Sequence, residues 1–170
     1  MRSIAEIFGK KADRTQDNII VDPMTGEVIP LSEMPDEVIN KKILGDGVAI
    51  LPNSGLVISP VSGTVVAIAD SLHAYCILSE RGLEILIHIG VDTVQLCGNG
   101  FKCHVMQGQQ IKRGTSLCHV DLALLESKQI PTHTAILLTN MSEEASLEYQ
   151  CGFVKQGDTL MKYSNPEKNK

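Results

Sequence analysis

The chain has 170 residues, of which 43% are hydrophobic and 21% are charged. This length and composition fit one globular domain and exclude wholesale disorder, a collagen-like repeat and a long coiled coil. The 15 basic and 20 acidic residues leave a net charge of −5, which argues against nucleic-acid binding through phosphate neutralisation. No apolar stretch approaches the roughly 18 residues that a membrane-spanning helix needs.

The ends of the chain differ from its middle. Residues 1–17 are polar apart from a short apolar stripe, and we expect a flexible arm there, with a membrane-touching helix as the alternative. Residues 164–170 are rich in Pro, Glu, Lys and Asn, and we expect a frayed tail. Residues 18–163 are expected to form one continuous domain.

Three short segments rich in β-branched residues predict strands over 64–68, 73–78 and 83–89. Turn signals recur along the same part of the chain, and this spacing favours an all-β fold, an antiparallel β-sandwich or barrel. Helix is expected only in short pieces. The capping patterns place them in one turn after Pro35, in 122–128 after Asp121 and in 143–147 after Ser142.

Two sequence patterns occur twice, which indicates an internal duplication. The pattern that begins Pro23-Met-Thr-Gly returns 37 residues later as Pro60-Val-Ser-Gly, each time before a predicted strand. The pattern around Gly114 returns 43 residues later around Gly157, and both glycines are expected to adopt a positive φ in a tight turn. Chance similarity between short turn–strand units is the alternative.

The five cysteines show no C-x-x-C spacing. Because the N-terminus lacks a secretory apolar segment, we expect a cytoplasmic protein whose cysteines are reduced thiols. Each cysteine is interpreted mainly as a small buried hydrophobe.

Of the five histidines, only His88 stands out by its context. Alternation along the predicted strand 83–89 places four apolar residues on the core face and turns His88 to the opposite face. Gly90 follows directly, and a glycine there lets another molecule approach the backbone closely. His88 is therefore a candidate nucleophile, with a hydrogen-bonded structural histidine as the alternative.

The other histidines carry weaker signals. His73 begins a similar predicted strand, two residues after the hydroxyl of Ser71, and neighbouring strands could bring it to His88, although the sequence does not show that pairing. His104 and His119 each follow a cysteine, and adjacent strand residues face opposite ways, so neither pair readily chelates one metal. His133 lies in a predicted loop, and we interpret these three as ordinary.

The segment from Gly82 to Val94 resembles the phosphorylation-site signature of the glucose-class enzyme IIA family of the bacterial sugar phosphotransferase system. The resemblance covers about residues 18–163. Further matching stretches follow in the family's order at 45–50, 60–65, 73–75, 98–101, 108–111 and 121–125. The resemblance implies an antiparallel β-sandwich with a shallow active-site depression.

The resemblance also assigns roles. His88 would accept a phosphoryl group on Nε2 from the histidine-containing phosphocarrier protein and pass it to a cysteine of an enzyme IIB domain. His73 would stabilise the phosphate, and the Gly90 carbonyl would hold the Nδ1 proton of His88. Ser71 stands where the family pattern has threonine, which keeps the hydroxyl and loses the methyl group.

The chemistry of imidazole suits these roles. A neutral ring has one donor and one acceptor nitrogen, so a hydrogen bond from Nδ1–H leaves Nε2 free to attack. The transfer that the resemblance implies needs no nucleotide and no cofactor, and the absence of a Walker loop agrees with that. Zinc on His73 and His88 is expected only as an incidental or partner-bridging ion. Apolar residues, Leu86, Val91 and Val94, would form a transient docking surface.

A stand-alone phosphocarrier would meet the membrane only through its permease, and regulatory target proteins are further candidate partners. Three alternatives stay open. The first is a regulatory binding module of the same fold without phosphotransfer. The second is a zinc metallopeptidase, because His88-Ile-Gly-Val-Asp92 gives an H-x-x-x-D half-site, although no H-x-H occurs. The third is a biotin- or lipoyl-type carrier domain.

Overall fold

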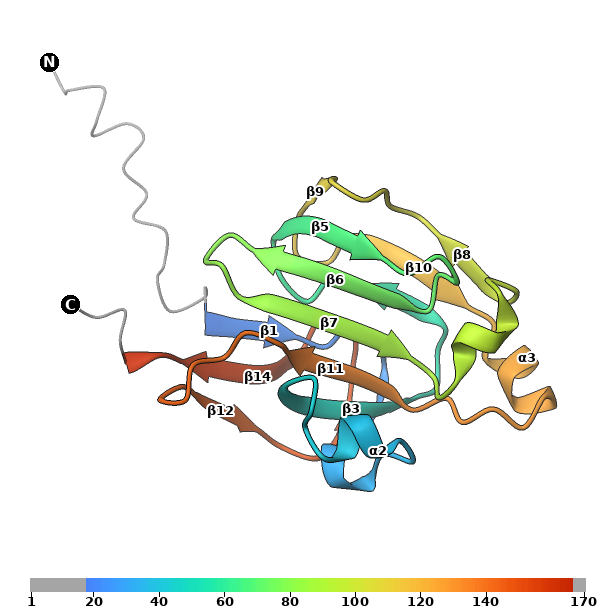
Figure 1. The fold of residues 1–170 in the computed structure, drawn as a ribbon, viewed down its shortest axis with the longest axis horizontal. Coiled ribbons are helices and arrows are strands. Elements are labelled where there is room, and N and C mark those ends of the chain that lie inside the picture. The colour runs from blue at the N-terminus through green and yellow to red at the C-terminus, as the bar shows by residue number, and fades with distance from the viewer. Residues whose placement is uncertain (1–17, 167–170) are drawn as a thin grey trace, which may run out of the picture.

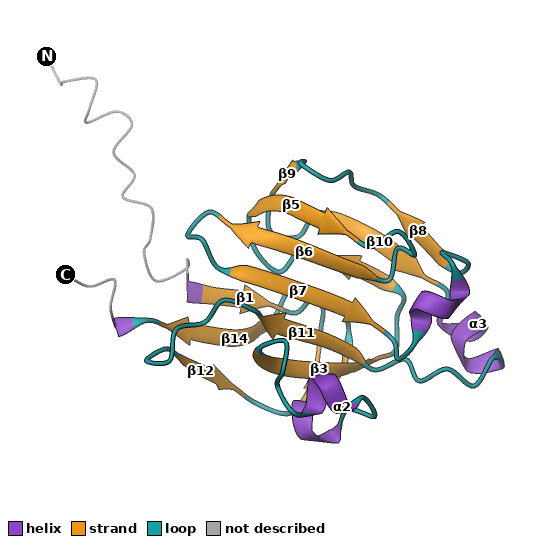
Figure 2. Cartoon of the chain, in the orientation of Figure 1, coloured by secondary structure: helices purple, strands orange, loops and turns teal. Residues whose placement is uncertain are grey.

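The computed structural model describes residues 18–166, so the predicted arm 1–17 and residues 167–170 of the predicted tail lie outside the described part. Short strands dominate and the helices are brief (Figures 1 and 2). The strands are β1 Ile19–Val21, β2 Gly26–Pro30, β3 Asp46–Pro52, β4 Leu56–Ile58, β5 Gly63–Ile68, β6 Ala74–Ser79, β7 Glu84–Ile89, β8 Phe101–Cys103, β9 Gln110–Ile111, β10 Ser116–Val120, β11 Thr134–Leu138, β12 Ser146–Tyr149, β13 Gly152–Val154 and β14 Thr159–Ser164. The helical turns are η2 Leu31–Glu33, α2 Glu37–Asn40, η3 Thr93–Leu96 and α3 Leu122–Ser127. No helix in the described range is long and apolar enough to cross a membrane.

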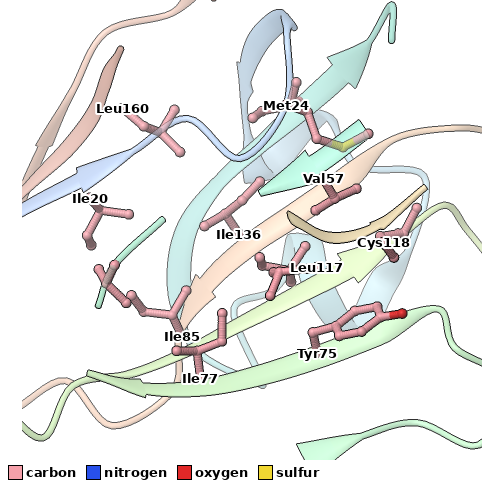
Figure 3. Close-up of a cluster of buried hydrophobic side chains, with 14 of the residues drawn as sticks. Ile20, Met24, Val57, Tyr75, Ile77, Ile85, Leu117, Cys118, Ile136 and Leu160 are labelled. Atoms are coloured by element: carbon pink, nitrogen blue, oxygen red, sulfur yellow. The ribbon is translucent and has the colours of Figure 1, made fainter. Parts of the chain in front are cut away.

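The strands form one large antiparallel sheet and two small ones. The large sheet has eight strands in the order β13-β2-β3-β11-β7-β6-β5-β9, and the small sheets have the orders β1-β14-β12 and β4-β10-β8. The predicted antiparallel sandwich is confirmed, and the described strands do not close into a barrel. The core lies where the sheets face one another, filled by side chains such as Ile77, Ile85, Leu117 and Ile136 (Figure 3).

The first repeated pattern forms a reciprocal contact. The backbone N–H of Val21 donates to the carbonyl of Pro60 at 3.1 Å, and the N–H of Ile58 donates to the carbonyl of Pro23 at 3.0 Å. Val21 and Ile58 are equivalent positions 37 residues apart, as are Pro23 and Pro60, so the two bonds are the same bond seen from each copy. Two copies that exchange equivalent bonds have an internal two-fold relationship, as expected of a duplicated unit.

The second repeated pattern docks on the first in the same way in both copies. Ser59 donates its N–H to the carbonyl of Thr115 and accepts from the N–H of Gly114. The equivalent residues in the other copy make the same two bonds: Asp22 donates its N–H to the carbonyl of Asp158, and its carbonyl accepts from the N–H of Gly157. Gly114 and Gly157 have φ values of 89° and 88°, so the predicted positive φ is confirmed.

Two of the three predicted helical pieces are present. Asp36 caps α2 by accepting from the N–H groups of Val38 and Ile39, and Asp121 caps α3 by accepting from the N–H of Leu124. Both caps follow from the short acceptor side chain, which satisfies N–H groups that have no partner within the helix.

The predicted helix over 143–147 is wrong. This segment is a turn that leads into β12, and β12 pairs with β14 through contacts such as Leu147 with Tyr163. The capping pattern after Ser142 is local, whereas the strand pairing supplies hydrogen bonds along a whole edge. Tertiary pairing therefore overrides the local preference.

A second, smaller apolar cluster lies on the other face of the large sheet. It joins residues of η2, its C-cap and α2 to residues of β2, β3, β11 and the turn after β7. Its members are Ile29, Leu31, Met34, Ile39, Ala49, Val91, Ala135 and Leu137. Burial of these side chains holds the η2–α2 segment against the sheet. In Figure 1, α2 lies beside β3, and Asp36 at the start of this helix acts electrostatically on His88.

Candidate functional site

His88 lies near the end of β7 and faces away from the main core. Ile85, Ile87 and Ile89 are fully buried on one face of the strand, while Leu86 and His88 are half-buried on the other. The period of two places successive side chains on opposite faces. The orientation predicted from the alternation is therefore confirmed.

Alanines flank His88 on both neighbouring strands. His88 pairs with Ala74 of β6 and with Ala135 of β11, and Ala135 pairs in turn with Ala49 of β3. Directly opposed residues share one face of an antiparallel sheet. The imidazole therefore stands in a row of methyl groups, which do not reach past its ring.

His73 lies directly beside His88. The two rings meet edge to face, with their centroids 5.1 Å apart and an interplanar angle of 83°. The carbonyl of His73 accepts from the N–H of Ile89 at 2.8 Å, which ties the two segments together next to the rings. The structure thus brings together the two histidines whose pairing the sequence left open.

A tight turn presents His73. Leu72 has a φ of 59°, a left-handed conformation that costs a residue with a side chain about 1–2 kcal/mol. Its N–H donates to the carbonyl of Ala69, whose own N–H donates to the carbonyl of Ala74. Ser71 lies half-buried in this turn. Strain held by surrounding hydrogen bonds is common where a side chain must be positioned for function.

The turn after β7 requires glycine at position 90. Gly90 has a φ of 72°, and a Cβ there would stand 2.4 Å from Cγ2 of Thr93. Thr93 is fully buried and its hydroxyl donates to the carbonyl of Ile89. Asp92 is also left-handed, with a φ of 56°. This folded turn fixes the backbone next to His88.

The environment keeps both imidazoles neutral. Burial lowers the pKa of His88, and the opposing influences of Asp36, the Gly90 backbone and Asp92 raise it in part. Burial, followed by the proximity of His88, lowers the pKa of His73. Since an unperturbed imidazole titrates near about 6.5, both rings are unprotonated at neutral pH and hold a nucleophilic nitrogen.

The Nδ1 atoms of both rings are buried and have no hydrogen-bond partner within the described residues. The Gly90 backbone nevertheless interacts with the His88 ring strongly enough to raise its pKa. The Gly90 backbone thus lies close to the His88 ring, but Nδ1 of His88 makes no hydrogen bond of normal geometry with the Gly90 carbonyl. The assignment stays a prediction.

Sequence reasoning missed Asp36. Its carboxylate caps α2 and also acts on His88, far away in the chain. The capping pattern after Pro35 signalled the helix, and no signal linked that cap to the histidine. His133 was treated as an ordinary loop residue, and it lies in the loop directly before β11, the strand that pairs with β7. His104 and His119 lie in or beside the small β4-β10-β8 sheet.

The predicted apolar docking surface is only partly exposed. Val94 is 52% exposed, whereas Val91 is buried and Leu86 is half-buried. Val91 packs under η2 and α2 in the smaller apolar cluster, which explains its burial. Val38 of α2, 44% exposed, is a further apolar side chain on this part of the molecule.

Within residues 18–166, no group of three or more His, Cys, Asp or Glu side chains is arranged to hold a metal ion. His73 and His88 supply two imidazoles, which is half of a tetrahedral zinc site. A zinc ion on these rings would therefore need ligands from outside the described chain.

Comparisons with known proteins agree with one another. Residues 18–144 match the family described as phosphoenolpyruvate-dependent sugar phosphotransferase system, EIIA 1. A "PTS system glucose-specific EIIA component" of Haemophilus influenzae is 36% identical over 156 residues, covering 92% of this chain and 94% of the relative. A protein of the same name from Bacillus cereus is 41% identical over 147 residues, covering 86% and 88%. The solved structure "glucose permease IIA from Mycoplasma capricolum" superposes with a TM-score of 0.79 at 41% identity, covering 84% and 93%.

Proposed function

The chain belongs to the EIIA 1 family of the phosphoenolpyruvate-dependent sugar phosphotransferase system, and from this premise we propose that His88 is its phosphorylated residue. The family assigns the chain to phosphotransfer in sugar uptake. The finer proposal is a cytoplasmic carrier that takes a phosphoryl group from the histidine-containing phosphocarrier protein and gives it to a cysteine of an enzyme IIB domain.

One observation supports this assignment above the others. Two imidazoles whose pKa values are lowered by burial stand edge to face, 5.1 Å between centroids, with His88 on the face of the large sheet that points away from the main core. One neutral ring can act as nucleophile while the other donates a hydrogen bond to the transferred group. The half-buried Ala74, directly opposed to His88 on β6, presents only a methyl group beside the ring, which supports placing a tetrahedral phosphoryl group on that side.

In the proposed reaction, Nε2 of His88 attacks phosphorus as the bond from phosphorus to the donor's imidazole nitrogen breaks. The donor ring leaves neutral, and the phosphoryl group is then attached to His88. In the second step a cysteine thiolate of the IIB domain attacks, an S–P bond forms and the N–P bond breaks. Such transfers depend mainly on positioning and on stabilising charge on the transferred oxygens.

His73 is proposed to donate a hydrogen bond to those oxygens, and Ser71 to support it from the preceding turn. Gly90 is proposed to orient His88 through its carbonyl. These roles are proposals that rest on proximity, since His73 touches His88 directly and Gly90 acts on its pKa.

The surroundings suggest the chemistry of the docking partners. Asp36 and Asp92 both act on His88 electrostatically, while Val38 and Val94 present exposed apolar side chains. A partner that combines basic and apolar groups would complement this surface. Zinc is proposed only as an ion shared with such a partner, held here by His73 and His88.

Phosphorelay assays test the proposal. The full chain is incubated with phosphoenolpyruvate, enzyme I and the phosphocarrier protein, and a purified IIB domain is then added. We expect one acid-labile phosphate on the chain, which leaves when the IIB domain arrives. If a control carrier in the same tube is phosphorylated and this chain is not, a regulatory module without phosphotransfer becomes the better account.

A further inference from the structure

Cys103 of β8 and Cys118 of β10 are directly opposed in the small β4-β10-β8 sheet, and both are free thiols. They come from separate segments joined by a connection that contains β9. The phosphotransfer site uses neither of them. Their relationship is therefore a feature of this chain that its proposed carrier role leaves unexplained.

The hydrogen bonds around the pair define its geometry. The N–H of His104 donates to the carbonyl of Leu117, and the N–H of Asp121 donates to the carbonyl of Gly100, each at 2.8 Å. Hydrogen-bonded and non-hydrogen-bonded pairs alternate along an antiparallel ladder. Cys103 and Cys118 are the pair next to the bonded pair of His104 and Leu117, so they form a non-hydrogen-bonded pair. Cα atoms in such pairs lie about 4.5 Å apart, and disulfides span about 4.4–6.8 Å.

The two sulfurs lie against the buried hydroxyl of Tyr75. Burial raises the pKa of Tyr75 well above its usual range, and Cys118 and Cys103 raise it further. The hydroxyl has no partner of hydrogen-bond geometry among the described residues. Figure 3 shows Cys118 and the Tyr75 ring at the same end of the core. Three side chains from three strands thus meet at one point.

Access to the two thiols differs. Cys118 is fully buried, and burial raises its pKa to about 12. Cys103 is half-buried, and its Sγ lies 3.1 Å from the carbonyl of Val105. An oxidant from solvent therefore meets Cys103 first, and Cys118 is placed to attack the sulfur of Cys103 afterwards.

We propose that Cys103 and Cys118 form a reversible intramolecular disulfide, a redox modification site separate from the phosphotransfer site. With a low-molecular-weight disulfide as oxidant, the Cys103 thiolate attacks one sulfur and releases one thiol. Cys118 then attacks the mixed disulfide and releases the second thiol. The two protein thiols lose two hydrogens and two electrons, which the oxidant gains as two thiols.

The disulfide ties β8 to β10 and closes the connection that carries β9, the edge strand of the large sheet. Closing the loop between Cys103 and Cys118 restrains the unfolded chain. The bond also lies beneath Tyr75 of β6, the strand that begins directly after His73. Oxidation therefore stabilises the sandwich on the core side of the strand that follows His73.

The test uses the full chain with the other three cysteines replaced, Cys76→Ser, Cys97→Ser and Cys151→Ser. The protein is equilibrated in glutathione buffers of graded potential and quenched in acid. Intact mass and peptide mapping then identify its sulfur linkages. We expect loss of two hydrogens in the monomer, a peptide linkage between positions 103 and 118, full reversal by dithiothreitol, and a melting temperature several degrees higher when oxidised.

Adding Cys103→Ser to the same background provides the matched control, with folding checked by circular dichroism. Under oxidising conditions the Cys103→Ser variant should form no intramolecular disulfide and should keep the melting temperature of the reduced parent. The proposal is overturned if the parent keeps both thiols in every buffer. It is equally overturned if the parent stops at a glutathione adduct on Cys103, or links only between molecules.

Discussion

Asp36 caps helix α2 and also acts on His88, so one carboxylate serves both the fold and the site. Burial lowers the pKa of His88, and Asp36 is the largest of the influences that oppose this shift. The helix that covers the outer face of the sheet thereby adjusts the charge state of the candidate nucleophile.

Replacing this carboxylate separates its two roles. Asparagine is an equally good capping residue, so Asp36→Asn should keep the helix and lower the pKa of His88 further. An NMR titration of the His88 ring measures the change. Asp121→Asn, at the equivalent cap of α3, is the matched control and should leave the pKa of His88 in place. An unchanged or higher pKa in Asp36→Asn would remove Asp36 from the site.

The edge-to-face contact of the histidines predicts a split phenotype. His73→Gln should still accept phosphate on His88, because the nucleophile and its backbone are untouched. Its transfer to a IIB domain should slow by one or more orders of magnitude, since removing a single charge-stabilising donor costs about 10²–10³ in rate in other enzymes. Rapid-quench measurement of each half-reaction checks this. Equal slowing of both steps would contradict a role for His73 that is specific to phosphate donation.

Gly90 and Gly108 allow backbone strain to be separated from steric clash. Both have a positive φ, but a Cβ at position 108 would meet nothing within 4 Å, whereas at position 90 it would collide with Thr93. Gly108→Ala should cost about 1–2 kcal/mol of unfolding free energy from conformation alone. Gly90→Ala should cost clearly more and also reduce phosphorylation. Equal losses in urea denaturation would show that the Gly90 turn tolerates a side chain.

Asp22 makes the stability depend on pH. It is fully buried, and burial followed by the charge of Asp158 raises its pKa from 3.8 to about 7. The folded state therefore holds a proton that the unfolded state releases, and Asp22 contributes stability below about pH 4 that is lost as the pH rises through 7. Each unit of pKa shift corresponds to about 1.4 kcal/mol, so the loss is on the order of 1–4 kcal/mol.

Asp22→Asn stays neutral throughout, so its stability relative to the parent should rise between pH 4 and pH 8. Urea unfolding at several pH values measures this difference. Asp158→Asn removes the charge that, after burial, raises the pKa of Asp22. Its stability relative to the parent should therefore also rise with pH, but by less. A difference that does not vary with pH would mean that Asp22 is ionised in the folded state.

The orientation of His88 could be predicted from the sequence because alternation along a strand is a local property. The caps at Asp36 and Asp121 and the turns at Gly114 and Gly157 were predictable for the same reason: each depends on residues within a few positions. The repeated patterns indicated an internal duplication, and the reciprocal bonds between the two copies agree with it.

Non-local relationships could not be predicted in this way. Nothing in the sequence sets the register that places His88 between Ala74 and Ala135, or the approach of Asp36 to the ring. The same holds for segment 143–147, where pairing with β14 outweighed a local helix signal. Each of these depends on which strands meet, and burial across the whole sheet decides that.

The most direct test of the account is the intact mass of the parent and of His88→Gln after incubation with phosphoenolpyruvate, enzyme I and the phosphocarrier protein. Phosphotransfer through His88 predicts one added phosphate on the parent, labile in acid and stable in base, and none on His88→Gln. A phosphate on His88→Gln at the parental level would contradict the assignment of His88 and require another residue to carry the reaction.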